Sequence, residues 1–194
     1  MRQIIVAALS LALITTACNN SNNQNEEGKE AVQDPSLPPQ SQLDEQGTSK
    51  LMTVIADYYQ LKDAFVASDA AKADAAAQKL MASNDSLKAH LQTDSTHGTD
   101  LVGYLDSVSI GSQSILAAND PSTEKKRIPF ETVSNAMFGL INKAQLKNAG
   151  VYRQYCPMAF NDKGAYWLSN ETEIKNPYFG KKMLECGEVT DTLK

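Results

Sequence analysis

The strongest constraint in the sequence is a helical spacing of apolar residues that runs from Thr48 to about Gly150. Leucine, valine, isoleucine, alanine and aromatic residues recur there three and four positions apart, which places them on one face of a helix. Breaks such as TDSTHG and NDP divide this stretch into four segments. Four helices with short connections favour an all-α fold, an up-down antiparallel four-helix bundle over residues 48–150.

Each segment contributes one apolar face to the predicted core. These faces are Leu51, Val54, Ile55, Tyr58, Leu61 and Phe65; Ala73, Ala76, Ala77, Leu80, Leu87 and Leu91; Leu101, Leu105, Val108, Ser112 and Ile115; and Phe130, Val133, Met137, Leu140, Ile141 and Ala144. We expect the fourth helix to begin with Asp120 as its cap and Pro121 in its first turn. Pro129 should kink or restart that helix, because proline removes a backbone donor and crowds the preceding turn.

An export signal precedes the helices. Arg2 is followed by IIVAALSLALITTA, an apolar run too short for a membrane span, and then by Cys18. A small residue and a cysteine directly after such a run resemble a bacterial lipoprotein signal, from which Thr15 departs at one position. The resemblance implies a signal peptide over residues 1–18, a lipid on Cys18, and a membrane anchor in the bacterial envelope that faces the periplasm or cell surface. The alternative is an ordinary signal peptide cleaved nearby.

Residues 19–47 have the composition of a disordered tether. They are rich in asparagine, glutamine, glutamate, serine and proline, and they contain too few large apolar residues to offset the entropy of the chain. The acidic residues that give the chain its formal net charge of −5 are concentrated in this segment. The rest of the chain is nearly neutral and has no basic stripe, which argues against a nucleic-acid partner.

No motif of a common enzyme class is present. The sequence lacks a phosphate-binding glycine loop, a G-x-S-x-G elbow and an H-E-x-x-H pair, so we predict that the protein is not an enzyme and assign no catalytic residue. The helical segments contain no inward Glu-x-x-His pairs, which argues against a di-iron site in the bundle. His90 and His97 are the two histidines, and we interpret them as solvated or capping residues rather than metal ligands.

After Gly150 the composition changes to an aromatic-rich extension, residues 151–194, which we assign to the same domain as the helices. It holds the single tryptophan, Trp167, and turn sequences such as NDKG and NP. We expect an irregular extension that packs against the end of the bundle with Trp167 as its anchor. Within it, AYWLS is a candidate short strand, and ETEIK and GKKMLEC are candidate helical turns.

Two of the three cysteines, Cys156 and Cys186, lie in this extension, and their chemistry leaves three interpretations open. An exported protein meets an oxidising compartment, which favours a disulfide. With Met158 and Met183 they would instead form a soft-metal site, because thiolate and thioether ligands select Cu(I) over zinc or magnesium, and Trp167 would shield the ion from water. In the third interpretation the same residues are only small hydrophobic groups and core filler.

Several motifs in the extension carry a resemblance. CPM, GAYWLS, NPYFG and MLxCG, together with YYQLKDAFVASDAAKADAAAQKL near the start of the helices, resemble domain-of-unknown-function family 3347 over roughly residues 50–189. That family occurs as secreted or lipid-anchored proteins and fused to adaptor subunits of heavy-metal efflux systems.

The resemblance implies a function as well as a fold. It favours an exported lipoprotein that binds copper as Cu(I) through Cys156, Met158, Met183 and Cys186, accessory to metal efflux or tolerance, with efflux components and a membrane as its partners. The alternative is a disulfide-stapled structural or protein-interaction domain that binds no metal. YRQYCPMA is also similar to a short Y-x-C-P-M-H heavy-metal module, but Ala159 stands where that module has histidine. Any ion would therefore depend on sulfur ligands, or on His90 or His97 brought in from the bundle.

Overall fold

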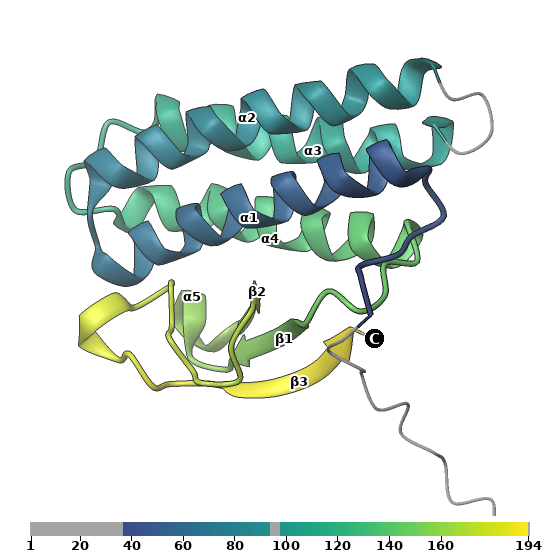
Figure 1. The fold of residues 1–194 in the computed structure, drawn as a ribbon. Helices are drawn as coiled ribbons and strands as arrows, with labels where there is room; N and C mark the ends of the chain where they lie inside the picture. Colours follow the sequence, from purple (N-terminus) through teal and green to yellow (C-terminus); the bar gives the residue numbers. More distant parts are fainter. Residues whose placement is uncertain (1–36, 94–97, 194) are drawn as a thin grey trace, which may run out of the picture. The chain divides into compact units, whose positions relative to one another are not determined.

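The computed structural model describes residues 37–93 and 98–193 of the 194-residue chain. Four helices come first in the chain: α1 (Glu45–Ala67), α2 (Ala70–Thr93), α3 (Gly98–Ala117) and α4 (Glu124–Lys143). Five short elements follow: β1 (Val151–Cys156), α5 (Ala159–Asp162), β2 (Ala165–Ser169), the 3₁₀ turn η1 (Gly180–Lys182) and β3 (Glu188–Leu193). Figure 1 shows the four helices grouped as a bundle and the later elements on one side of it.

The four helices pack against each other, as the spacing of apolar residues predicts (Figure 1). Every residue assigned to the four apolar faces is buried, and these side chains form one continuous hydrophobic core. Within residues 37–93 and 98–193, no helix combines the length and the apolar run that a membrane crossing needs.

The first helix begins earlier than its apolar face suggests. Asp44 is the N-cap of α1, and its carboxylate accepts a hydrogen bond from the Gly47 N–H at 2.6 Å. Ahead of it, Gln40 forms an antiparallel bridge with Lys147. The last part of the predicted tether, from residue 37 onward, therefore belongs to the fold. Cys18 and the rest of the predicted signal and tether lie outside the described residues.

The fourth helix differs from its prediction at two points. It begins at Glu124 rather than beside Pro121, while the Asp120 carboxylate accepts hydrogen bonds from the Ser122 and Lys125 N–H groups at 2.9 and 2.6 Å. Pro129 lies inside α4, so the expected restart does not occur. One proline costs one backbone hydrogen bond, and the buried side chains on either side of it hold the helix against its neighbours.

The extension is not irregular, and the all-α assignment needs a correction. It forms a three-stranded antiparallel sheet in the order β2-β1-β3, with Gln154 opposite Trp167 and Tyr155 opposite Glu188. The expectation of a strand at AYWLS is confirmed, since β2 covers those residues. ETEIK is not helical, and only Gly180–Lys182 of GKKMLEC forms a helical turn.

The sheet is attached to the helices by buried polar and cationic contacts. The N–H of Leu168 in β2 donates to the hydroxyl of Tyr58 in α1 at 3.0 Å. The guanidinium of Arg153 in β1 lies between the rings of Phe138 in α4 and Tyr166 in β2, 3.8 Å from each centroid. These contacts fix the position of β1 and β2, and with them the position of Cys156 at the end of β1.

Candidate metal centre

The loop between β2 and β3 covers the face of the sheet that carries Trp167 and Cys156. Gln154 holds the first part of this loop: its fully buried amide Nε2 donates to the carbonyl oxygens of Glu171, Thr172 and Glu173 at 2.8, 3.4 and 3.2 Å. The three successive carbonyl oxygens turn toward this one amide, and residues 171–173 form a bend rather than a helical turn.

Asn176 holds the second part of the loop. Its fully buried side chain donates to the Cys186 carbonyl oxygen at 2.7 Å and accepts hydrogen bonds from the N–H groups of Tyr178 and Phe179 at 2.8 and 3.2 Å. The backbone N–H of Asn176 donates to the Leu184 carbonyl oxygen at 2.8 Å. The NPYFG motif thus forms a turn that positions Cys186.

The two cysteines of the extension meet across β1 and β3. Cys156 ends β1 and Cys186 precedes β3, next to the paired residues Tyr155 and Glu188. Their Sγ atoms are 3.1 Å apart, and both thiols are free. This separation exceeds the roughly 2.05 Å of a disulfide bond. Cys156 is fully buried, whereas Cys186 is partly exposed, so the pair can be reached from the Cys186 side.

The neighbouring thiol changes the acidity of Cys186. Its hydrogen bond with Cys156, followed by desolvation, raises the pKa of Cys186 to about 11, and the Met158 N–H, which donates to the Cys186 sulfur, acts in the opposite direction. Cys186 is therefore a neutral thiol at neutral pH. A cation would have to displace its proton, which makes metal binding depend on pH.

The structure brings the two thiols together, and both methionines lie near Cys186 through backbone contacts. Met158 follows Cys156 closely, yet its side chain is 46% exposed and lines a separate pocket. Met183 lies just after η1, where its carbonyl oxygen accepts a hydrogen bond from the Cys186 N–H at 3.2 Å. Both methionines are thus neighbours of Cys186 through the backbone.

Trp167 lies close to the thiol pair, as the predicted shielding role requires. It is 1% exposed, and a Cβ added to Gly187, the residue after Cys186, would lie 2.9 Å from its ring. Gly187 has a φ of +151°. In the described part of the chain, the indole N–H of Trp167 and Oε1 of the opposite Gln154 lack hydrogen-bond partners. The extension therefore has unpartnered buried polar atoms on the face of the sheet that carries Cys156.

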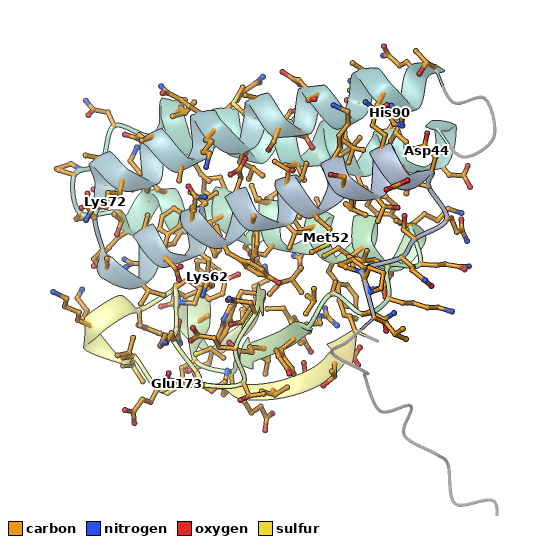
Figure 2. The ribbon with its side chains drawn as sticks, viewed as in Figure 1. Asp44, Met52, Lys62, Lys72, His90 and Glu173 are labelled. Carbon is orange, nitrogen blue, oxygen red and sulfur yellow. The ribbon has the colours of Figure 1, made fainter. Side chains whose placement is uncertain are left out.

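The histidines do not supply a ligand to this site. His90 in α2 forms a 2.9 Å hydrogen bond with Asp44 at the start of α1. Both residues are labelled in Figure 2, at one end of the helices. His97 lies outside the described residues. No group of three or more histidine, cysteine, aspartate and glutamate residues that could hold an ion occurs within residues 37–93 and 98–193. A metal at this site would depend on sulfur.

Sequence reasoning missed three buried polar residues that shape this region. Gln154 and Asn176 hold the loop, and Arg127 in α4 donates to the Pro177 carbonyl oxygen at 2.8 Å. The asparagine had a usable signal, because an Asn-Pro pair marks a turn. Nothing in the KKR sequence of residues 125–127 indicates that Lys125 is exposed while Lys126 and Arg127 are buried.

Comparison with known proteins assigns a family to the helical part of the chain. A family model described as Protein of unknown function (DUF3347) matches residues 54–149. The chain belongs to this family. The match begins within α1 and ends before β1, so the cysteines and methionines of the extension lie beyond the matched residues. No curated protein and no solved structure matches the chain significantly.

Proposed function

We propose that this DUF3347 protein binds a soft metal cation, Cu(I) before any other, at Cys156 and Cys186. The observation that carries the proposal is the 3.1 Å approach of two free thiols in a site that is buried on one side and accessible on the other. Thiolates are soft ligands, and soft ligands favour Cu(I) over the harder ions that carboxylates bind. On this proposal, the four helices form an up-down bundle that serves as a rigid support for the sheet and its thiols.

Binding would require a small rearrangement of the thiol pair. Metal–sulfur bonds are roughly 2.3 Å long, so the two sulfur atoms must separate from 3.1 Å to admit an ion. Cys156 is fixed in β1, whereas Cys186 lies in the loop before β3 and can move more easily. The flexible thioethers of Met158 and Met183, both adjacent to Cys186, would then supply further sulfur ligands, and Trp167 would keep water away.

The wider role follows from the sequence. We propose an exported lipoprotein that is anchored through a lipid on Cys18 and faces the periplasm or cell surface. It would capture the ion without catalysis and act beside heavy-metal efflux components in efflux or tolerance. The lipid prediction has its own test: Cys18→Ala should release the protein into the soluble fraction, and continued membrane retention would contradict it.

A disulfide-stapled domain that binds no metal is the second candidate, and the same distance favours it. The thiols need only a small side-chain rotation to bond, and the bond would join the end of β1 to the start of β3. Closing a loop between residues 30 positions apart would contribute about 3.5 kcal/mol in the loop-entropy model. The two candidates exclude each other at any moment, because a disulfide leaves no thiolate to bind an ion.

Competition for Cu(I) separates the candidates. Fully reduced protein is titrated with Cu(I) in the presence of a chromogenic chelator, beside an unrelated dithiol peptide. We expect one ion per chain, bound more tightly than by the peptide, and a loss of affinity of about a hundredfold in Cys186→Ser, which removes a thiolate at a partly exposed position. Met183→Leu and Met158→Leu should cause smaller losses.

The matched control is Met81→Leu, since Met81 lies in α2, which packs on α1 and α3. Affinity equal to that of the dithiol peptide, or an unchanged affinity in Cys186→Ser, would contradict metal binding. If protein isolated without reductant contains the Cys156–Cys186 bond and reduced protein binds Cu(I) no better than the peptide, the disulfide candidate stands.

A further inference from the structure

Arg127 in α4 is a buried cation without a carboxylate partner. The residue is 5% exposed, and its guanidinium donates to the carbonyl oxygens of Pro177 and Phe65 at 2.8 and 3.3 Å and to Ser68 Oγ at 2.9 Å. All three acceptors are neutral. No carboxylate of the described residues lies within ion-pair distance of Arg127. Since buried charges in proteins are normally paired, this guanidinium points to an anionic group from outside the chain.

The guanidinium lines a pocket of about 440 Å³, a size typical of small-molecule sites. Among the described residues no group pairs with its remaining nitrogen, Nη1, and that atom is not one of the buried nitrogens that lack a partner. Nη1 is therefore accessible from the pocket. The apolar part of the lining comes from Met158, Ala159, Phe160, Tyr178 and Phe179.

The other charged groups of the pocket limit what it can bind. Glu124 and Lys182 also line it and pair with each other at 2.6 Å, so they neutralise one another. Asp162 lines the pocket with an exposed carboxylate that has no partner in the described structure. The pocket therefore offers one cation without a carboxylate at ion-pair distance, Arg127, on which the charges of Glu124 and Asp120 act from farther away, and one carboxylate without a partner, Asp162. A phosphate dianion would be repelled by Asp162, whereas a ligand with one carboxylate and one ammonium group matches both charges.

The backbone that carries Asp162 is held in an unusual conformation. Phe160, Asn161 and Asp162 have φ values of 54°, 58° and 64°, in the left-handed region that residues with side chains rarely adopt. Such strain persists only where the surrounding structure imposes it, and it is found preferentially at ligand sites. Here it places Phe160, Asn161 and Asp162 in the wall of the pocket that Arg127 also lines.

We propose that this pocket binds a free amino acid with an apolar side chain. The carboxylate would pair with Arg127 Nη1, the ammonium group would pair with Asp162, and the side chain would pack against Phe160 and Phe179. The pocket adjoins the thiol pair, because Met158 lines it and donates its N–H to the Cys186 sulfur. The amino-acid site needs no metal, however, and it stands or falls independently of the proposed copper site.

Calorimetric titration of reduced, metal-free protein tests the site with ligands that each lack one group. L-Leucine carries both charges, N-acetyl-L-leucine lacks the ammonium group, leucinol lacks the carboxylate, and inorganic phosphate tests for a general anion site. We expect saturable binding of L-leucine and losses of about tenfold or more for each analogue, because each one leaves a charge of the pocket unpaired. Phosphate should neither bind nor compete.

Variants assign the two ends of the ligand. Asp162→Asn is an exposed change that should weaken L-leucine about five- to tenfold and leave N-acetyl-L-leucine unaffected. Arg127→Gln should abolish binding of both, with circular dichroism as the check on folding. Lys181→Gln is the matched control, since Lys181 is exposed beside Lys182 and is not part of the pocket lining.

Several results would overturn the proposal. These are the absence of saturable L-leucine binding up to about 10 mM, equal binding of leucinol and L-leucine, and an unchanged affinity in Asp162→Asn. If Arg127→Gln fails to fold, the comparison of leucinol with L-leucine on the unchanged protein still decides the role of the carboxylate. Cys186→Ser should lose Cu(I) and keep L-leucine, so the failure of either site is visible separately.

Discussion

The hydroxyl of Tyr58 in α1 lies 2.8 Å from Oγ of Ser134 in α4, inside the hydrophobic core. The same hydroxyl accepts the N–H of Leu168, so one phenol joins two helices to the sheet. Burial raises the pKa of Tyr58 far above its ordinary value, so the hydroxyl is neutral at neutral pH. This short chain of hydrogen bonds connects the core to the strand that carries Trp167.

Tyr58→Phe should therefore destabilise the protein by about 1–3 kcal/mol, because it leaves the buried Leu168 N–H without an acceptor. The measurement is the free energy of unfolding from urea denaturation followed by circular dichroism. Tyr104→Phe is the control, since Tyr104 is 36% exposed on α3. Equal stability of the Tyr58 variant and the control would show that the hydrogen bond contributes little.

Gly187→Ala should disrupt the region of the thiol pair. An added Cβ would lie 2.7 Å from the Tyr155 carbonyl oxygen and 2.9 Å from the Trp167 ring, at a backbone φ of +151° that favours glycine. We expect a loss of stability of about 2 kcal/mol or more and a change in Trp167 fluorescence.

Gly103→Ala provides the matched comparison for that change. Nothing lies within 4 Å of a Cβ added at Gly103, inside α3. Alanine is the better helix former, so this variant should gain about 0.5–1 kcal/mol. A Gly187 variant as stable as the Gly103 variant would mean that β3 and its loop shift to make room, and that the thiol pair is less tightly held than the distances indicate.

The helices were predictable because their information is local. A spacing of three and four residues identifies the buried face of a helix, and Leu51, Leu80, Leu105 and Phe130 are all buried as that spacing predicts. The positions of the helix ends are set by polar contacts, which the spacing of apolar residues does not predict. Asp44 extends α1 toward the N-terminus, and Asp120 stabilises the turn before α4 rather than beginning the helix itself.

The sheet and the site were predictable only in part, because they depend on residues far apart in the chain. The aromatic strand around Trp167 was visible from its composition, but its partner β3 is mostly exposed and polar and has no clear strand pattern. The proximity of Cys156 and Cys186 follows from the pairing of β1 with β3. The burial of Arg127 follows from acceptors in α1, at its C-cap and in the loop after β2.

Asp120 should make the fold sensitive to acid. Its carboxylate accepts the backbone N–H of Lys125, followed in strength by the Ser122 hydroxyl, and these bonds lower the pKa of Asp120 from 3.8 to about 2. A carboxyl group whose pKa is lower in the folded state stabilises the fold above the unfolded value, and this stabilisation is lost as pH falls through the folded value. The contribution of Asp120 is therefore complete at neutral pH and disappears between about pH 4 and pH 2.

Asp120→Asn tests this dependence through urea midpoints measured at several pH values. The variant should be less stable than the unchanged protein at pH 7, and the difference should shrink steadily below pH 4. The control is Asp85→Asn, an exposed change in α2, whose urea midpoint should equal that of the unchanged protein at every pH. A gap between Asp120→Asn and the unchanged protein that stays constant down to pH 2 would mean that the amide or some other feature of the variant, and not the lost charge, is responsible.

The reactivity of Cys186 should report the state of the thiol pair. Alkylation requires a thiolate, and the hydrogen bond with Cys156, together with burial, raises the pKa of Cys186. In the folded, reduced protein, iodoacetamide should therefore modify Cys186 more slowly at pH 7 than it modifies an ordinary exposed cysteine, with a rate that rises as the pH approaches 11. Cys156→Ser removes the largest cause of the shift, so it should accelerate alkylation of Cys186 at pH 7. Peptide mass spectrometry after timed quenching measures the alkylation rates. An unchanged rate in Cys156→Ser would show that the neighbouring thiol does not control the reactivity of Cys186.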